Sequence, residues 1–236
     1  MLNALVADLR LLCRLHDREV DAGLLDELRR IPVKDWFSLA FSTPEATTGL
    51  DLVGQALTTL PDPADHSVLD LLAADYADIY LTFGARVAPN ESYWMTEDHL
   101  ERQEPMFTVR DWYSHYGLAV NDWRRRADDH LVHELEFVAS LLAMPEPHAR
   151  LDAARFMDRH LLAWAPAFFA GTAARAGTPF YAGLALVSLS HLQATRDLLQ
   201  AITGETRCEP PPLPGDGVSK DAEEAGSYHP GAGPGW

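Results

Sequence analysis

The sequence contains little cysteine and no long apolar run. Only two cysteines occur in 236 residues, Cys13 and Cys208, and they lie far apart along the chain. Two isolated thiols do not make a disulfide framework or a thiolate cluster, and this usage is typical of a reducing compartment. No stretch approaches the roughly 20 apolar residues that a membrane-spanning helix needs, and the N-terminus lacks the basic segment of a secretion signal. The sequence therefore predicts a cytoplasmic protein without stable membrane insertion.

Positive charge is also scarce. Lysine and arginine total 19 against 35 aspartates and glutamates, which gives a net charge of −16. Because an acidic surface repels phosphate backbones, we expect no nucleic-acid partner. The same field attracts a basic partner, such as a peptide with paired arginines, although it also serves solubility alone. Hydrophobic residues make up 47% of the chain, which is sufficient for a packed interior.

Motifs that hold phosphate or metal are missing. The chain has neither a GxxxxGK[ST] loop nor a GxGxxG segment opening a helix. His130, His133 and Glu134 lie within one helical turn, yet neither HExxH nor a Glu-x-x-His pair occurs. There is no GxSxG elbow, although spacing alone does not exclude a triad assembled in space. We therefore expect no metal, no cofactor and no catalytic residues, and we interpret the protein as a non-enzyme.

Apolar residues recur at three- and four-residue steps along most of the chain, which is the spacing of amphipathic helices. No alternating run bounded by hairpin turns is found. The predicted fold class is all-α. Helices are expected at 2–13, from a cap at Asp21 to Pro32, and at 44–60, 68–83, 97–104, 109–116, 129–144, 149–164 and 180–202, with a loop at 85–94.

We interpret these helices as a bundle-like fold of two lobes joined by a hinge. An N-terminal lobe covers 1–117, a polar connection covers 118–127, and a C-terminal lobe covers 128–204. Such a long connection permits a domain-swapped dimer as well as a monomer. Residues 205–236 are rich in proline, glycine and acidic residues without apolar periodicity, so we expect a disordered or loosely attached tail.

The densest group of ionisable residues is the run Asp128-Asp129-His130-Leu131-Val132-His133-Glu134, directly before an apolar helical face. An acidic residue at a helix start caps free backbone N–H groups and favours the helix dipole. A carboxylate there also suits a charge-assisted contact with a guanidinium, and a histidine changes charge near neutral pH. These properties make Asp129 and His130 candidate recognition residues, with Asp128 as a cap or an arginine partner.

Five motifs, in this order, resemble the TorD/DmsD family of cytoplasmic chaperones. They are an aromatic helix from Tyr76 to Phe83, a string from Pro89 to Tyr93, the Tyr116-Gly117 pair, Asp129-His130 with Glu134-Leu135-Glu136-Phe137, and a helix from Phe156 to Trp164. The chain departs from the family where Ala127 replaces a proline found in many relatives. Its aromatic helix also uses tyrosine where some relatives have tryptophan.

The resemblance implies a chaperone that binds the twin-arginine signal peptide and the catalytic subunit of a molybdopterin-containing oxidoreductase, assisting cofactor insertion and proofreading before export. The family's leader-binding positions correspond here to Tyr76, Ile79, Tyr80, Gly84, Gly117, Asp129 and His130. Tyrosines suit a groove for an apolar peptide because they bury their rings and keep a polar tip. The run Arg124-Arg125-Arg126 beside the site is interpreted as a partner of Asp128 and neighbouring acids, or as a client contact.

Two other function classes stay open. One is a structural subunit that is retained in a redox complex after assembly. The other is a nucleotide-binding hydrolase, which the resemblance allows although the sequence offers no phosphate cradle. Co-purification with the mature enzyme supports the first, and nucleotide turnover that is lost on mutation of His130 supports the second.

Overall fold

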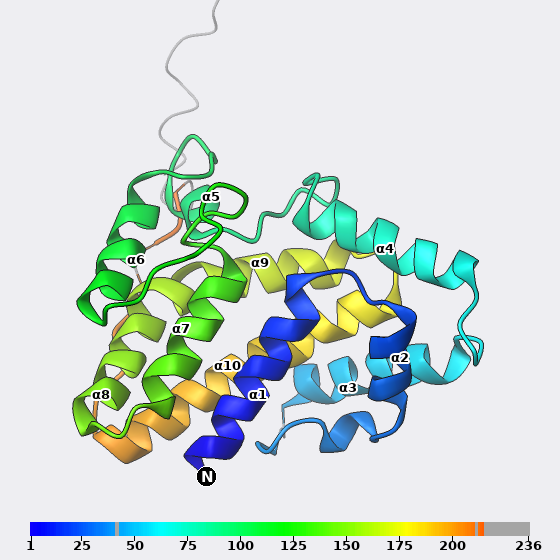
Figure 1. Ribbon diagram of the computed structural model, residues 1–236, viewed down its shortest axis with the longest axis horizontal. Coiled ribbons are helices and arrows are strands. Elements are labelled where there is room, and N and C mark those ends of the chain that lie inside the picture. Colours follow the sequence, from blue (N-terminus) through cyan, green and yellow to red (C-terminus); the bar gives the residue numbers. More distant parts are fainter. Residues whose placement is uncertain (41–42, 211, 215–236) are drawn as a thin grey trace, which may run out of the picture.

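The computed structural model describes residues 1–40, 43–210 and 212–214, and it contains no β-strand over these ranges. The all-α prediction is confirmed, and none of the described helices is long and apolar enough to cross a bilayer. Figure 1 shows the arrangement. The elements are α1 (Leu2–Asp17), α2 (Ala22–Arg29), η1 (Val33–Asp35), α3 (Pro44–Thr59), α4 (His66–Tyr80), α5 (Glu91–Met95), α6 (Glu104–His115), α7 (Leu131–Ala143), α8 (Pro147–Phe156), η2 (Met157–Leu161), α9 (Leu162–Arg175) and α10 (Pro179–Thr203).

Short polar side chains begin several of these helices. Asp21, predicted as a cap, accepts a hydrogen bond from the Leu24 N–H at 2.8 Å at the start of α2. Thr43 caps α3 and Asp65 caps α4 in the same way. Each of these side chains satisfies an N–H group that the helix leaves without an internal partner.

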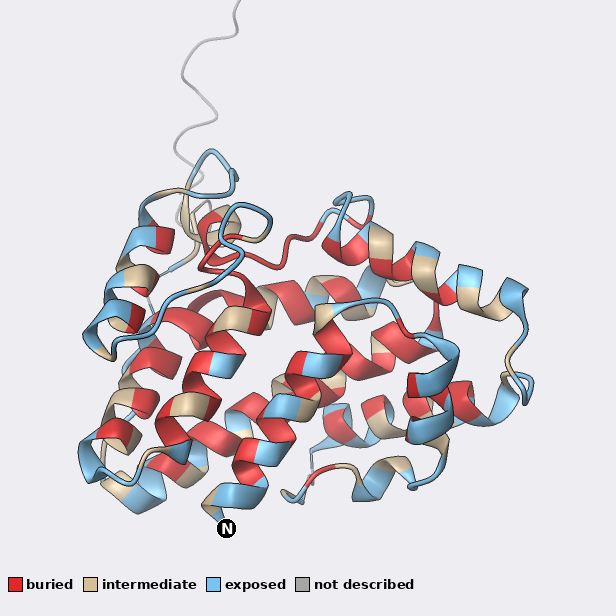
Figure 2. Cartoon of the chain, in the orientation of Figure 1, coloured by how far each residue is buried: buried red, intermediate tan, exposed pale blue. Residues whose placement is uncertain are grey.

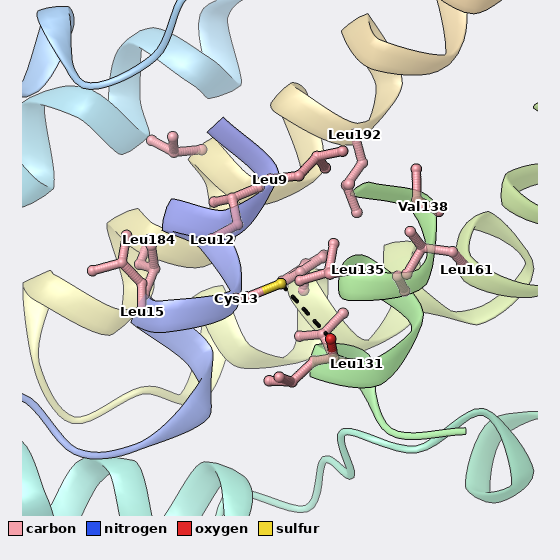
Figure 3. Close-up of a cluster of buried hydrophobic side chains, with 14 of the residues drawn as sticks. Leu9, Leu12, Cys13, Leu15, Leu131, Leu135, Val138, Leu161, Leu184 and Leu192 are labelled. Carbon is pink, nitrogen blue, oxygen red and sulfur yellow. Dashed lines mark hydrogen bonds between the residues drawn. The ribbon is translucent and has the colours of Figure 1, made fainter. Parts of the chain in front are cut away.

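Three helix pairs form most of the core. Helix α1 packs along α7, and α10 packs on α3 and α9. Buried side chains concentrate on the facing sides of these helices, while α2 and α4 expose their outer faces (Figure 2). The close-up of Figure 3 draws Leu9 and Leu12 of α1 and Leu135 and Val138 of α7 in one cluster of buried apolar side chains. The Cys13 thiol donates to the Val132 carbonyl oxygen at 3.7 Å.

Helices α3 and α10 cross at a pair of glycines. A Cβ added to Gly183 would lie 2.6 Å from the Gly49 carbonyl oxygen, and one added to Gly49 would lie 2.9 Å from the Gly183 carbonyl oxygen. Both contacts are with backbone, which cannot move aside as a side chain can. The close approach of these helices therefore requires glycine at both positions.

The region between α4 and α7 differs most from the sequence prediction. Residues 97–103 are not helical; α6 begins at Glu104 instead, with Pro105 in its first turn, where proline is favoured. The expected loop at 85–94 contains the short helix α5. Helix α4 ends at Tyr80 rather than Phe83, because Phe83 adopts a left-handed φ of 55°.

Helix α7 begins two residues later than predicted. Its N-cap is His130, whose side chain accepts from the Val132 N–H, and the helix proper starts at Leu131. The aspartates before it have other partners. A single bridge pairs Asn90 with His130, and the Leu131 N–H donates to the Pro89 carbonyl at 2.8 Å. The segment that enters α7 is thus held against the segment that enters α5.

A buried ion pair connects α10 to the π-helical segment η2. Arg196 donates two hydrogen bonds of 2.7 Å to the Asp158 carboxylate, and Arg196 is fully buried. The Cys208 N–H donates to the same carboxylate at 3.0 Å, and Glu205 pairs with Arg155 at 2.8 Å. The first residues of the predicted tail therefore contact the bundle, whereas residues 211 and 215–236 lie outside the described residues.

Both cysteines are free thiols. Because α1 precedes residue 118 and packs on α7, which follows residue 127, the two halves of the sequence share one core. The division into two lobes about a hinge at 118–127 stays a prediction. The connection itself contains no helix.

Candidate functional site

A hollow of about 530 Å³ lies beside the end of α4 and next to the connection before α7. Three of the predicted site residues, Tyr76, Tyr80 and His130, line it together. The full lining is Asp17, Tyr76, Tyr80, Leu81, Phe83, Asn90, Glu101, Asp122, Arg125, Arg126, Ala127 and His130. The hollow thus combines an aromatic and apolar side with a side rich in charged groups.

The two tyrosines form the aromatic wall. Their rings stack with centroids 4.6 Å apart, and both residues are buried. The Tyr76 hydroxyl donates to the Asp17 carbonyl at 2.7 Å, and burial raises the pKa of Tyr76 to about 12. The Tyr80 hydroxyl lies 2.6 Å from His16 Nδ1. Since both hydroxyls already have partners, the tyrosines offer ring surface to a ligand rather than a polar tip.

Ile79 lies on the same helix but faces away from the hollow. It is fully buried within the apolar core and is not among the residues of the lining. The helical spacing that groups Ile79 with the two tyrosines is therefore the spacing of a core face.

Exposed apolar side chains form the rim where α4 ends. Leu81 is 63% exposed and Phe83 is 37% exposed, and Phe83 stacks on Tyr93 with centroids 6.2 Å apart. Gly84 follows at an exposed bend, where an added Cβ would lie 2.6 Å from Asp78 Oδ1. Large apolar side chains exposed at the edge of a hollow are typical of a surface that binds another chain.

The His130 side chain, which lines the hollow, is neutral. Its Nδ1 accepts from the Val132 N–H at 3.2 Å, which leaves the ring proton on Nε2 in the neutral tautomer. Burial, together with the charge of Arg126, lowers the pKa of His130 well below its ordinary value. His130 therefore supplies an uncharged N–H donor rather than a charge that changes near neutral pH.

Asp129 does not line the hollow and is fully buried behind it. Its Oδ2 accepts from the Ser92 N–H at 2.8 Å and from the Ser92 hydroxyl at 2.5 Å. Burial raises the pKa of the Asp129 carboxyl, which the Ser92 hydrogen bonds oppose. In the free protein this carboxylate fixes the start of α5 rather than facing solvent.

Gly117 also lies away from this hollow. It ends α6 with a left-handed φ of 67°, and no atom lies within 4 Å of the position that a Cβ would take. The next residue, Leu118, lines a smaller hollow of about 270 Å³, which shares Asp122 with the first. The structure thus gives Gly117 a role in turning the chain.

Several residues of the family motifs build a buried polar network that the sequence does not predict. The Glu91 carboxylate accepts from His160 Nδ1 at 3.0 Å, and Glu134 accepts from the Trp164 indole N–H at 3.2 Å. Burial raises the pKa of both carboxyls, and the charge of Glu91 raises the pKa of Glu134 further. The network joins α5, α7, η2 and α9 directly behind Asp129.

The ion pairs around the hollow leave some carboxylates occupied and others open. Asp128 pairs with Arg110 at 2.8 Å, so its arginine partner comes from α6 and not from the run at 124–126. Arg126 pairs with Asp17 at 2.5 Å, while Arg124 lies over the Trp123 ring. Glu101 forms no ion pair within the described part of the chain.

No group of three or more histidine, cysteine or acidic side chains is arranged to hold a metal ion within the described ranges. Asp129 Oδ2, the Glu91 carboxylate and Glu134 Oε2 accept hydrogen bonds from protein groups. The arrangement at the hollow offers ring surface, exposed apolar rim, a neutral donor and open carboxylates, which are the properties of a binding surface for a cationic and partly apolar chain.

A family model and individual known proteins both match this chain, and they point to the same family. Residues 48–170 match the family model described as nitrate reductase delta subunit. The chain is 28% identical over 160 residues to a protein named Chaperone protein TorD from Vibrio cholerae serotype O1, covering 64% of this chain and 72% of that one. It is 24% identical over 166 residues to Chaperone protein TorD from Aliivibrio fischeri, covering 66% and 76%. Another protein of that name, from Aliivibrio salmonicida, is 24% identical over 182 residues, covering 73% and 84%.

The family model spans slightly more than half of the sequence. It includes α4, every residue of the hollow's lining except Asp17, and the polar network behind the hollow. The motifs from Tyr76 to Trp164 lie inside the same span. On this evidence the chain belongs to the TorD/DmsD family of chaperones.

Proposed function

We propose that this protein is a cytoplasmic maturation chaperone for a molybdopterin-containing oxidoreductase. It binds the twin-arginine signal peptide and the apo-form of that enzyme, and it holds back export until the cofactor is inserted. The observation that carries this proposal is the hollow beside α4, in which an apolar rim and an aromatic wall face open carboxylates. The relatives named Chaperone protein TorD support the chaperone role.

The chemistry of a twin-arginine leader suits such a hollow. The leader carries two guanidinium groups followed by an apolar stretch, so it needs carboxylates and an apolar surface side by side. Leu81 and Phe83 are exposed at the rim, and Glu101 and Asp122 lie in the same lining. The net charge of −16 adds a long-range attraction for a basic peptide.

Calorimetry with a synthetic leader peptide tests the proposal. The peptide is taken from a molybdoenzyme encoded beside this chain, and a second peptide replaces both arginines with glutamine. We expect the first to bind the wild-type protein and the second to bind far more weakly. If both peptides fail to bind, or if they bind equally well, the proposed function is wrong.

A matched pair of variants localises the binding. Leu81→Ser removes an apolar side chain that lies on the rim and is 63% exposed. Leu71→Ser removes one that is 55% exposed on α4 but is not part of the lining. Because a buried leucine contributes about 1.5–3 kcal/mol, Leu81→Ser should weaken binding about tenfold or more, whereas Leu71→Ser should leave it unchanged.

A retained subunit of a redox complex is the second candidate, and the description of the matching family as nitrate reductase delta subunit favours it. A retained subunit purifies with the mature enzyme, whereas a transient chaperone purifies only with the apo-form that still carries its leader. Affinity purification from the two client forms distinguishes these roles. Size-exclusion chromatography of the free protein tests whether it is a monomer or a domain-swapped dimer.

A further inference from the structure

We propose that Glu101 is the carboxylate that receives a guanidinium of the leader peptide, and that Asp129 acts on recognition only by positioning the loop that carries Glu101. This inference rests on the proposed function and names the charged contact within the same hollow. Sequence reasoning assigned the contact to Asp129, which is fully buried.

Most acidic residues near the hollow already have partners. Asp129 accepts both hydrogen bonds of Ser92, Asp128 pairs with Arg110, and Asp17 pairs with Arg126. A peptide guanidinium that used one of these carboxylates would first have to displace a partner of the protein. The remaining acids of the lining are Glu101 and Asp122.

Asp122 is the weaker candidate because cations lie on the same turn. The backbone N–H groups of Arg125 and Arg126 donate to the Asp122 carbonyl oxygen at 2.7 and 3.2 Å, which places both arginines on the turn of Asp122. Both arginines also line the hollow, so a peptide cation at Asp122 would approach two cations of the protein. The charge of Arg102 acts on Glu101, but Arg102 forms no ion pair with it, and the Arg102 guanidinium donates to the Arg124 carbonyl oxygen at 3.0 Å. A peptide guanidinium would therefore meet less repulsion from protein cations at Glu101 than at Asp122.

Glu101 is also placed where it gains from a cationic ligand. It is exposed, it lines the hollow, and partial burial together with the charge of Asp129 raises the pKa of its carboxyl. A guanidinium that approaches this carboxylate would relieve the repulsion from Asp129. Arginine is favoured over lysine because its planar group donates two parallel hydrogen bonds to one carboxylate.

A chain of hydrogen bonds ties the Glu101 loop to Asp129. The Ser92 hydroxyl donates to Asp129 at 2.5 Å and accepts from the Gln103 N–H at 3.1 Å. The bond from Arg102 to the Arg124 carbonyl holds the other side of the loop. Because Gln103 follows Glu101 by two residues, loss of the Asp129 carboxylate releases the loop from its support. This makes Asp129 a positioning residue.

The test compares Glu101→Gln with Glu97→Gln, which removes the same charge from an exposed glutamate that is not in the lining. We expect Glu101→Gln to weaken calorimetric binding of the twin-arginine peptide about tenfold or more, as for loss of a charge-assisted hydrogen bond. Glu97→Gln should bind like wild type. The twin-glutamine peptide should not distinguish Glu101→Gln from wild type.

Asp129→Ala and the double variant Asp129→Ala/Glu101→Gln test the positioning role. If Asp129 acts through Glu101, Asp129→Ala weakens binding in the wild-type background but adds little once Glu101 is glutamine. Additive losses would overturn the positioning role. Circular dichroism checks that each variant is folded.

The outcomes separate this inference from the proposed function. If the wild-type protein does not bind the peptide, the proposed function is wrong. If Leu81→Ser weakens binding but Glu101→Gln binds like wild type, the hollow binds the leader and the assignment of Glu101 is overturned. If Asp122→Asn loses more affinity for the peptide than Glu101→Gln does, the assignment of Glu101 is overturned in favour of Asp122.

Discussion

The Asp129 carboxylate accepts two hydrogen bonds from Ser92, one from its backbone N–H at 2.8 Å and one from its hydroxyl at 2.5 Å. This pair joins the segment before α7 to the start of α5, 37 residues earlier. Both residues are buried, so the bond is part of the fold before any ligand binds.

Ser92→Ala should therefore destabilise the protein. It removes the hydroxyl that Asp129 and Gln103 share and leaves a buried carboxylate short of a donor, which costs about 1–3 kcal/mol. Urea denaturation followed by circular dichroism measures the change. Ser67→Ala, which removes an exposed hydroxyl on α4, serves as the control. An equal effect of the two substitutions would show that the buried bond contributes nothing special.

Glu134→Gln should be far better tolerated than Glu134→Ala. Burial and the nearby Glu91 raise the pKa of the Glu134 carboxyl well above its ordinary value, and glutamine resembles its neutral form while still accepting from Trp164. Alanine loses that bond and leaves a cavity, at a cost of about 2–4 kcal/mol.

The pH dependence of stability checks the same carboxyl. A raised carboxyl pKa means that the folded state keeps its proton when the unfolded chain has lost it. The stability from the protonated form is therefore present at low pH and decreases as the pH rises through the folded-state pKa. Melting temperatures between pH 5 and 8 (about the usual range of maximal stability) should fall less steeply for Glu134→Gln than for wild type. Parallel curves would contradict this interpretation.

His16 should make the protein sensitive to acid. Full burial lowers the pKa of His16 from 6.5 to about 3, and the ring is held between Tyr80 and Ser188. The unfolded chain takes up a proton below about pH 6.5 that the native ring does not. Stability present above that pH is lost as the pH falls toward 3, by about 2 kcal/mol at pH 5. Urea midpoints at pH 7 and pH 5 should converge in His16→Gln.

The buried pair of Arg196 and Asp158 should show strong coupling. Removing one partner leaves an uncompensated buried charge, so Arg196→Met should cost about 3–5 kcal/mol. The double variant Arg196→Met/Asp158→Leu removes both charges and should be more stable than Arg196→Met alone. Denaturation of the two single variants and the double variant measures the coupling. If the losses in free energy of unfolding are additive, the two residues do not stabilise each other.

Gly117→Ala should cost about 1 kcal/mol because alanine is strained at a φ of 67°. No neighbour obstructs a Cβ there, so the cost is purely conformational, and Gly117→Asn should lose less. Leader affinity of the folded variants, measured by calorimetry, should match wild type. A selective loss of affinity without a loss of stability would return Gly117 to the binding site.

The periodicity of apolar residues was sufficient to predict the long helices, because burial on one face governs where α1, α3 and α10 form. It could not reveal which polar residues meet. Ser92, which holds Asp129, lies in a segment expected to be a loop, and Glu101 is an ordinary exposed glutamate outside every motif. The π-helical segment at 157–161 was predicted as regular helix, although it places Asp158 against Arg196 and His160 against Glu91.

The pairing of α1 with α7 also determines when this protein can fold. The ribosome synthesises α1 first, and α7, the helix on which α1 mainly packs, begins only at Leu131. Helix α10, on which α3 packs, is synthesised later still. Native structure is therefore completed after most of the chain has been synthesised, and a nascent chain stalled before α7 exposes a stripe of leucines. A protein that protects an unfinished client thus passes through its own unprotected stage during translation.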